Sequence, residues 1–382
     1  MMARLDELGK IITGNTPKTS DALNYSSNDI CFVKPSDILD GEITVITDSE
    51  FYISNYARDK ARILPPKSVL VTCIGIIGKV AINNVECAFN QQINAIVPDT
   101  SKCLTEYLAY AIQNKQKEMQ DIANAPVVPI LNKTQFSEIE IELPSIESQT
   151  EVVAKMRAID DLTSLRKQQL SKLDELVKSR FIEMFGDPMT NSHDFVLKKY
   201  GDLFELNAGG TPSKQKPEYW DNGTISWIGS NMCQNTVIYK NDGNYITEEG
   251  LKHSSARMFP VDTVLIALVG ATIGKTALLK FETTTNQNVL GIRGIRENGY
   301  TPEFVFYYTQ GLYQKFLDIG DGGFAMASKG FISELPVPLV DLALQEQFTN
   351  FVELTDNLKS AIQKSLDQLE TLKKALMQKY FG

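Results

Sequence analysis

The sequence is poor in the residues and motifs on which catalytic and metal sites depend. It has only two histidines, His193 and His253, in 382 residues, which leaves little for general-base or metal chemistry. Its five cysteines are odd in number and form no CxxC pair, which argues against a disulfide framework or a zinc site and fits a reducing cytosol. GxGxxG, HExxH, GxSxG and the Asp/Asn-Pro-Pro-Tyr/Phe motif of amino-methyltransferases are absent. We therefore expect neither catalysis nor a bound metal or cofactor from this chain alone.

A long apolar run and a basic segment are missing as well. Residues 1–7 are acidic without an apolar core, and no run approaches the ~20 residues that cross a bilayer, so we expect a cytoplasmic protein. The net charge is −9, whereas a protein that binds nucleic acid unaided usually has a basic face. The chain therefore avoids DNA, concentrates its few cations on one face, or leaves most phosphate contacts to a partner.

An internal repeat organises the chain. A length of 382 residues with 43% hydrophobic content allows two or three folded domains. The two halves match in order, at an offset of 195 residues that becomes 196 after a one-residue insertion behind Gly270. The matches include Thr16-Pro17 with Thr211-Pro212, Ala61-Arg62 with Ala256-Arg257, Gly78-Lys79 with Gly274-Lys275, Asn90-Gln91 with Asn286-Gln287, Lys133 with Lys329, Gln149 with Gln345, and Phe185-Gly186 with Phe381-Gly382. This order indicates a tandem duplication of the whole half.

Each half combines a globular part with a long helical segment. Short apolar runs separated by Gly, Pro and Asn predict strands, which in the first half are Ile30–Val33, Ser68–Ile74, Val80–Asn83 and Ile93–Val97. Helical patches at 104–119 and 302–317 interrupt the strands, so the predicted class is α+β. The predicted division into globular part and helix, twice over, is 1–145, 146–187, 188–341 and 342–382.

The two helical segments carry an apolar stripe with a spacing of three or four residues and contain no Gly or Pro. About 38 residues at ~1.5 Å each correspond to about 57 Å. A narrow stripe of this kind packs on a partner helix, and we expect the two segments to pair antiparallel as a coiled coil about an approximate two-fold axis. The alternative is a long core helix within each domain. The predicted packing residues are Ile159, Leu162, Leu173, Val177, Leu358, Ile362, Leu369 and Leu376.

A glycine turn followed by lysine occurs in both halves. Residues Gly270 to Thr276 resemble a phosphate-binding loop, but only three residues separate the first glycine from Gly-Lys, where the ATP-binding pattern needs four. The first half, from Gly75 to Val80, is shorter still. Two interpretations stay open: a tight strand–strand turn in which glycine supplies φ > 0, or a turn whose N–H groups and lysine contact a nucleic-acid phosphate.

Amides and polar loops supply further candidates. The segments 90–92 and 286–288 either tie loops together, which their recurrence favours, or bind adenine. The early loops at 14–20 and 209–216 and the late loops at 124–133 and 320–329 differ between the halves, which suits readers of different sequences or simple loop drift. The candidate DNA-binding residues are Thr16, Lys18, Lys34, Ser36, Lys79, Gln92, Lys133, Thr211, Ser213, Lys214, Lys216, Ser230, Asn231, Thr272, Lys275, Asn288 and Lys329.

Taken in order, these motifs make the chain resemble the specificity subunit of type I restriction–modification systems over essentially its full length. The likeness rests on segments 210–213, 219–220 and 225–228, then 264–266, 270–275 and 286–287, and on the helix start at 143–149. The first half departs from the pattern, because it has no Trp and a shorter glycine turn.

The resemblance implies two target-recognition domains, each of which reads one half of a bipartite site in double-stranded DNA. It implies that the paired helices set the gap and dock two methylation subunits, which would bring S-adenosylmethionine, and that a restriction and translocase subunit can join. A different hypothesis is a scaffold that presents two β-rich modules on a helical stalk without touching DNA. A third is a nucleotide-hydrolysing enzyme that uses the Gly270 turn.

Overall fold

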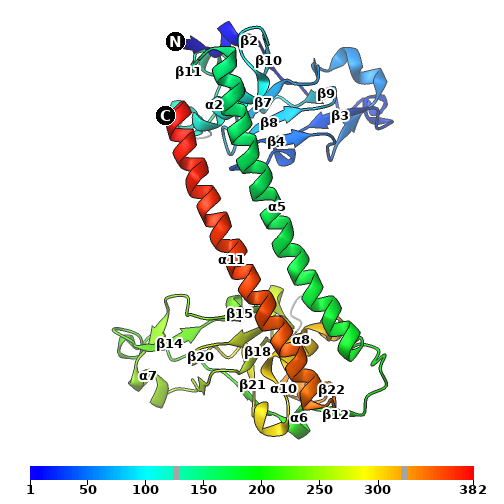
Figure 1. Ribbon diagram of the computed structural model, residues 1–382, viewed down its shortest axis with the longest axis vertical. Coiled ribbons are helices and arrows are strands. Elements are labelled where there is room, and N and C mark those ends of the chain that lie inside the picture. The colour runs from blue at the N-terminus through cyan, green and yellow to red at the C-terminus, as the bar shows by residue number, and fades with distance from the viewer. Residues whose placement is uncertain (124–128, 320–325) are drawn as a thin grey trace. The chain divides into compact units, whose positions relative to one another are not determined.

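The chain folds into two compact units in a computed structural model that describes residues 1–123, 129–319 and 326–382. Unit 1 contains residues 1–167 and 364–382, and unit 2 contains residues 168–363. Each unit holds one globular head and one half of each long helix (Figure 1). The parts of the predicted late loops at 124–128 and 320–325 lie outside the described residues.

Head 1 runs from β1 to β11 and head 2 from β12 to β22. Head 1 contains β1 (Met2–Arg4), α1 (Leu5–Leu8), β2 (Gly9–Thr13), β3 (Ile30–Val33), β4 (Thr44–Ile46), β5 (Tyr52–Ile53), β6 (Ile63–Leu64), β7 (Val69–Thr72), β8 (Val80–Asn83), β9 (Cys87–Phe89), β10 (Ile93–Pro98), α2 (Thr105–Asn114), α3 (Gln116–Ile122), α4 (Lys133–Ser137) and β11 (Glu140–Glu142). Head 2 contains β12 (Leu197–Lys199), α6 (Tyr200–Leu203), β13 (Glu205–Ala208), β14 (Ile225–Ile228), β15 (Thr236–Ile238), β16 (Tyr245–Ile246), α7 (Glu248–Lys252), β17 (Met258–Phe259), β18 (Val264–Ala267), β19 (Thr276–Leu279), β20 (Thr283–Thr285), β21 (Val289–Arg293), α8 (Pro302–Gly311), α9 (Tyr313–Leu317), α10 (Lys329–Ser333) and β22 (Pro336–Pro338).

The two heads share one sheet topology. Head 1 has a five-stranded sheet in the order β2-β10-β7-β8-β4 and a four-stranded sheet in the order β5-β3-β9-β6. Head 2 repeats both, as β13-β21-β18-β19-β15 and β16-β14-β20-β17, and each head adds a two-stranded sheet. The central strands β7 and β18 are buried along their whole length, as expected for apolar strands covered on both faces. The predicted α+β repeat is confirmed.

Two continuous helices of 40 residues, α5 (Ile146–Phe185) and α11 (Leu342–Phe381), follow the heads. In unit 1, Lys373 of α11 pairs with Asp160 of α5 at 2.7 Å, while the Lys155 ammonium lies 3.3 Å from the Tyr380 hydroxyl. The residue number rises on one helix as it falls on the other, so the helices run antiparallel there.

Unit 2 shows the same arrangement. Lys359 pairs with Asp174 at 2.7 Å, and the ring of Phe181 lies 5.2 Å from that of Phe348. The predicted antiparallel packing of the helices therefore holds within each unit.

A buried glutamine fixes the start of each long helix to the head before it. Gln149 is fully buried; its Oε1 accepts the N–H of Leu104 at 2.9 Å, and its Nε2 donates to two backbone carbonyls. Gln345 does the same with the N–H of Thr301 at 3.0 Å and two carbonyls. Because buried amides need their hydrogen bonds, each glutamine holds head and helix in one arrangement.

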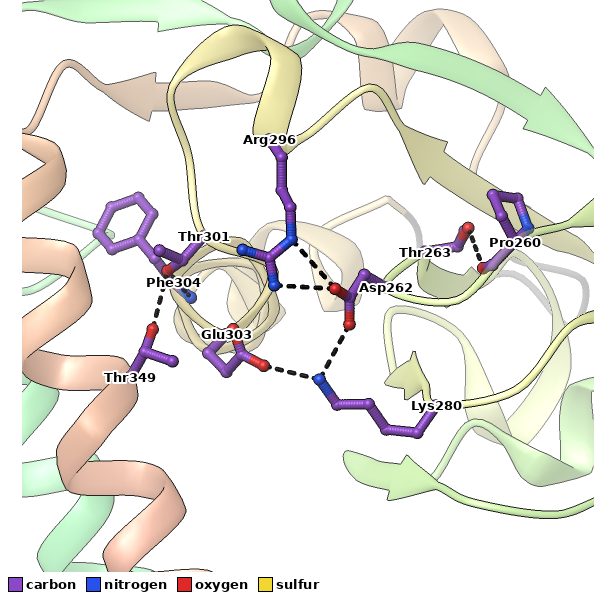
Figure 2. Close-up of polar contacts among 9 residues, drawn as sticks. All are labelled: Pro260, Asp262, Thr263, Lys280, Arg296, Thr301, Glu303, Phe304 and Thr349. Atoms are coloured by element: carbon purple, nitrogen blue, oxygen red, sulfur yellow. Dashed lines mark hydrogen bonds and ion pairs between the residues drawn. The ribbon is translucent and has the colours of Figure 1, made fainter.

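A charged cluster in head 2 lies beside this junction (Figure 2). The Lys280 ammonium is 2.9 Å from Asp262 and 2.8 Å from Glu303, and Arg296 pairs with Asp262 at 2.8 Å. Burial raises the pKa of Asp262, but the hydrogen bonds from Lys280 and Arg296 outweigh it, and the net effect is a lowered pKa. The cluster links the strand ends to α8. The start of α8 in turn contacts α11, because the hydroxyl oxygens of Thr301 and Thr349 lie 3.1 Å apart.

Candidate nucleic-acid interface

The early loop and the Asn-Gln turn meet in both heads. In head 1 the Thr16 hydroxyl donates to Oε1 of Gln91 at 2.6 Å. In head 2 the Thr211 hydroxyl donates to Oε1 of Gln287 at 2.5 Å. Both glutamines are exposed. Because the amide oxygen is occupied, the NH₂ group of each glutamine is left as a donor for another partner.

Glycine is required where these two segments cross. A Cβ atom on Gly14 would lie 2.1 Å from the carbonyl oxygen of Asn90, and one on Gly209 would lie 2.5 Å from the carbonyl oxygen of Asn286. Backbone cannot yield at such a distance, so the early loop approaches the turn closely only without a side chain there.

The asparagine of each Asn-Gln pair shapes the turn. Oδ1 of Asn90 accepts the N–H of Gln92 at 3.0 Å, and Oδ1 of Asn286 accepts the N–H of Asn288 at 3.0 Å. Asn90 also donates to the side chain of Gln92 at 3.0 Å. These are turns of the type in which Asn mimics the backbone, which supports the scaffold interpretation for the asparagines.

The glycine turns connect two strands in each head. Gly75 and Gly78 lie between β7 and β8 with φ of +79° and +85°, and Gly270 and Gly274 lie between β18 and β19 with φ of +69° and +73°. A phosphate-binding loop of ATPases opens a helix, whereas β19 follows here. The geometry therefore favours the strand–strand turn over nucleotide binding.

The lysine after each turn reaches another loop. The Lys79 ammonium donates to the carbonyl oxygen of Pro35 at 2.6 Å and also to that of Ile38. The Lys275 ammonium donates to Oε1 of Gln234 at 3.0 Å. An ammonium has three donors, so Lys79 spends most of them on holding the loop after β3.

Different aromatic residues hold the early loop in the two heads. The Tyr25 hydroxyl donates to the carbonyl of Pro17 at 2.7 Å in head 1. In head 2 the indole N–H of Trp220 donates to the carbonyl of Ser213 at 3.1 Å, and that of Trp227 to the carbonyl of Gly210 at 3.2 Å. The same scaffold therefore presents two differently shaped loops.

Two arginines that were not among the candidates chosen from the sequence also lie beside the early loops. Arg62 donates to the carbonyl of Thr13, and Arg257 donates to Oδ1 of Asn207 at 3.2 Å. Their recurrence in the repeat was the available signal. Arg257 lines a cavity of about 380 Å³ together with Lys329, a residue that the sequence does single out.

The predicted DNA-binding residues all lie on loops or at element ends, and they differ in exposure. Those that are exposed are Thr16, Lys18, Ser36, Lys133, Ser213, Lys214, Lys216, Asn231 and Lys329. Those that are half-buried are Lys34, Lys79, Gln92, Thr211, Ser230, Thr272, Lys275 and Asn288. The Lys34 ammonium is 3.0 Å from the centre of the Phe51 ring, and that of Lys216 is 3.0 Å from the Tyr219 hydroxyl. Which of them bind DNA stays a prediction.

The predicted packing residues of the helices divide into three groups. Ile159 and Val177 are buried, whereas Leu162 and Leu358 are about half exposed. Those of intermediate exposure are Leu173, Ile362, Leu369 and Leu376. The apolar stripe is thus only partly covered, because one partner helix hides one face of its mate.

The buried cysteines are unsuited to nucleophilic chemistry. All five are free thiols, and four of them are buried. Burial raises the pKa of Cys73 to about 11 and that of Cys233 to about 12, so these thiols stay protonated at neutral pH. Within the described residues there is no cluster of His, Cys, Asp and Glu that could hold a metal ion, and no described helix is long and apolar enough to cross a membrane.

Comparison with known proteins decides the family. The sequence model of the protein family described as the type I restriction modification DNA specificity domain matches residues 1–175 and 192–371. The chain belongs to this family. It is a DNA-specificity component of a type I restriction system rather than an enzyme by itself.

Relatives of this specificity family are distant in sequence. The chain is 24% identical over 322 residues to the MjaIX specificity subunit of Methanocaldococcus jannaschii, covering 78% of this chain and 73% of the relative. It is 24% identical over 281 residues to the EcoR124I/EcoR124II specificity subunit of Escherichia coli, covering 70% and 67%.

Solved structures share the fold. The S subunit of a type I restriction–modification system from M. genitalium has a TM-score of 0.59 at 15% identity and covers 100% of this chain and 96% of its own. A chain from work on complex assembly in a type I R-M system has a TM-score of 0.63 at 16% identity, covering 100% and 97%.

Proposed function

We propose that this specificity subunit directs DNA methylation to a bipartite site. Each head reads one half of the site in double-stranded DNA, and α5 and α11 set the gap between the halves. Two methylation subunits dock on the helices and bring S-adenosylmethionine, and a restriction and translocase subunit can join. The proposal includes a cytoplasmic location, where these partners and the DNA would meet.

The contrast between scaffold and loops carries the proposal. Both heads have the same sheet order and the same Thr–Gln contact, yet their early loops differ in sequence and in the aromatic residues that hold them. A shared scaffold with divergent exposed loops suits two readers of different base sequences, because bases are read by side chains in the grooves.

Continuous helices suit the role of a ruler. Both helices have 40 residues without Gly or Pro, which corresponds to about 60 Å of straight helix. Half-sites read on one face of a duplex are spaced by about 34–36 Å per turn, so a stiff connection favours one gap over others.

Exposed leucines support the docking of two partners. Leu162 and Leu358 occupy matched positions in α5 and α11 and are 45% and 50% exposed, and the matched Leu176 and Leu372 are 49% and 48% exposed. Unit 1 holds Leu162 and Leu372, and unit 2 holds Leu176 and Leu358. A feature that occurs once in each unit suits two copies of the same partner.

The decisive experiment is a genome-wide N6-methyladenine map in cells with and without this chain, with the methylation subunits present. We expect one split motif to lose methylation when the chain is absent. Exchange of residues 1–145 for a foreign recognition domain should change one half of the motif, and insertion of four residues near Leu165 should lengthen only the gap. A map without any change, or simultaneous change of both halves, would contradict the proposal.

A scaffold without DNA contact is the second candidate, which the net charge of −9 favours. The scaffold and the DNA-reading subunit predict different effects of salt on DNA affinity. Each phosphate contact contributes about −0.9 to the log–log slope of affinity against salt. A flat response of the assembled complex would support the scaffold.

A further inference from the structure

Four cations occupy equivalent places in the two heads. Arg62 directly precedes β6 and Arg257 directly precedes β17, while Lys133 and Lys329 are the first residues of α4 and α10. All four side chains are exposed. The duplicated scaffold thus carries the same pair, one arginine and one lysine, on each head, although the loops around them differ.

Among the residues that the structure describes, these four cations have no acidic partner. Within the described residues no carboxylate lies within ion-pair distance of any of the four, whereas nearby Arg58 pairs with Glu86 at 2.7 Å and Lys60 with Asp21 at 2.9 Å. Other lysines and arginines in the described part of the chain also lack a carboxylate partner, so these four are distinguished by their equivalent places on both heads. A cation that is exposed at the same place in each head suits a negative charge that both heads meet from outside.

Each arginine is positioned by the strand that leads into the early loop. Arg62 donates to the carbonyl of Thr13 at the end of β2, and Arg257 donates to Asn207 near the end of β13. The backbone N–H of Arg62 also donates to Asn15 in the early loop at 2.8 Å. One contact fixes each guanidinium, and its remaining donors suit a two-pronged contact with phosphate.

In head 2 the two cations share one cavity. Arg257 and Lys329 line a space of about 380 Å³ with Ser254, Ser255 and the end of β13 up to Gly209. No lining residue that the structure describes is acidic. Two cations and two hydroxyl-bearing residues form a set that matches a singly charged phosphodiester.

We propose that Arg62 with Lys133, and Arg257 with Lys329, are equivalent phosphate clamps that hold the DNA backbone irrespective of sequence. This inference rests on the proposed function. Two half-sites of different sequence share only the sugar–phosphate backbone, so groups kept alike on both heads contact the backbone. Base reading falls to the loops that differ, such as 17–20 and 213–216.

The test measures DNA affinity of the complete complex with its methylation subunits as a function of salt. Arg257→Gln with Lys329→Gln should reduce the log–log slope by about 0.9, because the contact with one phosphate is lost. The affinity lost between 50 and 200 mM salt should then shrink by about 3.5-fold. Binding to the cognate duplex and to one with a scrambled half-site should weaken by the same factor, and the methylated motif should stay the same.

Matched variants separate charge from structure. Arg257→Lys with Lys329→Arg keeps both charges and should retain the slope. Lys198→Gln removes an exposed lysine from β12, which is not part of the early or late loops. This variant should leave the salt slope and the DNA affinity unchanged. In head 1, the pair Arg62→Gln and Lys133→Gln should reduce the salt slope by the same amount.

The outcomes distinguish this inference from the proposed function. One outcome is that the unmodified complex binds DNA with a steep salt slope and methylates a split motif, while the glutamine pair leaves the slope unchanged or alters the motif. The phosphate clamp would then be wrong, and the proposed DNA-reading function would remain supported. A flat slope and no motif in the unmodified complex overturn both. Calorimetry with inorganic phosphate alone should give no heat in the low millimolar range; binding abolished by the glutamine pair would identify a free anion as the ligand and overturn the DNA assignment.

Discussion

Replacement of Lys280 by methionine tests how head 2 is held together. The substitution keeps most of the apolar stem but removes the ammonium that lies 2.9 Å from Asp262 and 2.8 Å from Glu303. The side chain of Glu303 is only 8% exposed, and its second oxygen, Oε2, is buried without a hydrogen-bond partner among the described residues. The variant therefore leaves a largely desolvated carboxylate without its cation.

The expected cost lies between two limits. Exposed ion pairs contribute about 0.2–1 kcal/mol, and removal of one partner from a fully buried pair costs about 3–5 kcal/mol. The side chains of Lys280 and Asp262 are 28% and 25% exposed, so this cluster is intermediate. We expect Lys280→Met to lower the free energy of unfolding of unit 2 by about 2 kcal/mol, which corresponds to about 4–8 °C in Tm for a unit of this size.

Tryptophan fluorescence reads this unit selectively, since the only two tryptophans, Trp220 and Trp227, both lie in unit 2. The matched control is Lys252→Met on α7, an exposed lysine for which we expect less than about 0.5 kcal/mol. Glu303→Gln should recover part of the loss in the Lys280→Met background, because it removes the stranded charge.

The effect should also depend on pH with a defined sign. The pKa of Asp262 is lowered in the folded state, so its contribution is present above the ordinary value of about 3.9 and is lost as pH falls through the lowered pKa. The difference in Tm between the unmodified chain and Lys280→Met should therefore narrow at acid pH. A loss below about 0.5 kcal/mol, or one that does not change with pH, would refute this reasoning.

Three further outcomes follow from particular contacts. Gln345→Leu should destabilise unit 2 by about 1–3 kcal/mol, because it leaves a buried N–H and two carbonyls unpaired; fluorescence melts measure it, and Gln149→Leu should show an equal loss of hydrogen-exchange protection in unit 1. Leu176→Asp with Leu358→Asp should lower the number of bound methylation subunits from two to one in native mass spectrometry, and retention of two would argue against docking there. Gly274→Ala should destabilise head 2 by at least about 1 kcal/mol in the same melts, since φ is +73° there, and an unchanged Tm would contradict the strained turn.

Much of the architecture was predictable because it repeats along the chain. The duplication predicted two like heads, and the strands expected at Ile30–Val33 and Val80–Asn83 are observed with those bounds. The very short strands, such as β5 and β6 with two residues each, carry no periodicity that a sequence pattern can reveal. They form because neighbouring strands complete their hydrogen bonds.

The interface was predictable as a region rather than as a set of contacts. Loops 14–20 and 90–92 were singled out separately, but only the fold brings Thr16 to Gln91. Lys79 stood among the cations expected at DNA, and the structure shows its ammonium bonded to backbone carbonyls of the next loop. Arg62 and Arg257 were visible as repeat matches, yet nothing in their spacing tells that no carboxylate in the described part of the chain lies within ion-pair distance of them.

The order of residues alone was enough to predict the duplication, the α+β heads, the two long helices and the absence of a catalytic set, because these depend on composition and on periodicity along the chain. Packing in three dimensions decided which cations pair with carboxylates, which leucines on the helices stay exposed, and how Gln149 and Gln345 hold the helix starts. Those features depend on which groups from distant segments come within a few ångströms, and electrostatic and hydrogen-bond energies change most steeply over that range.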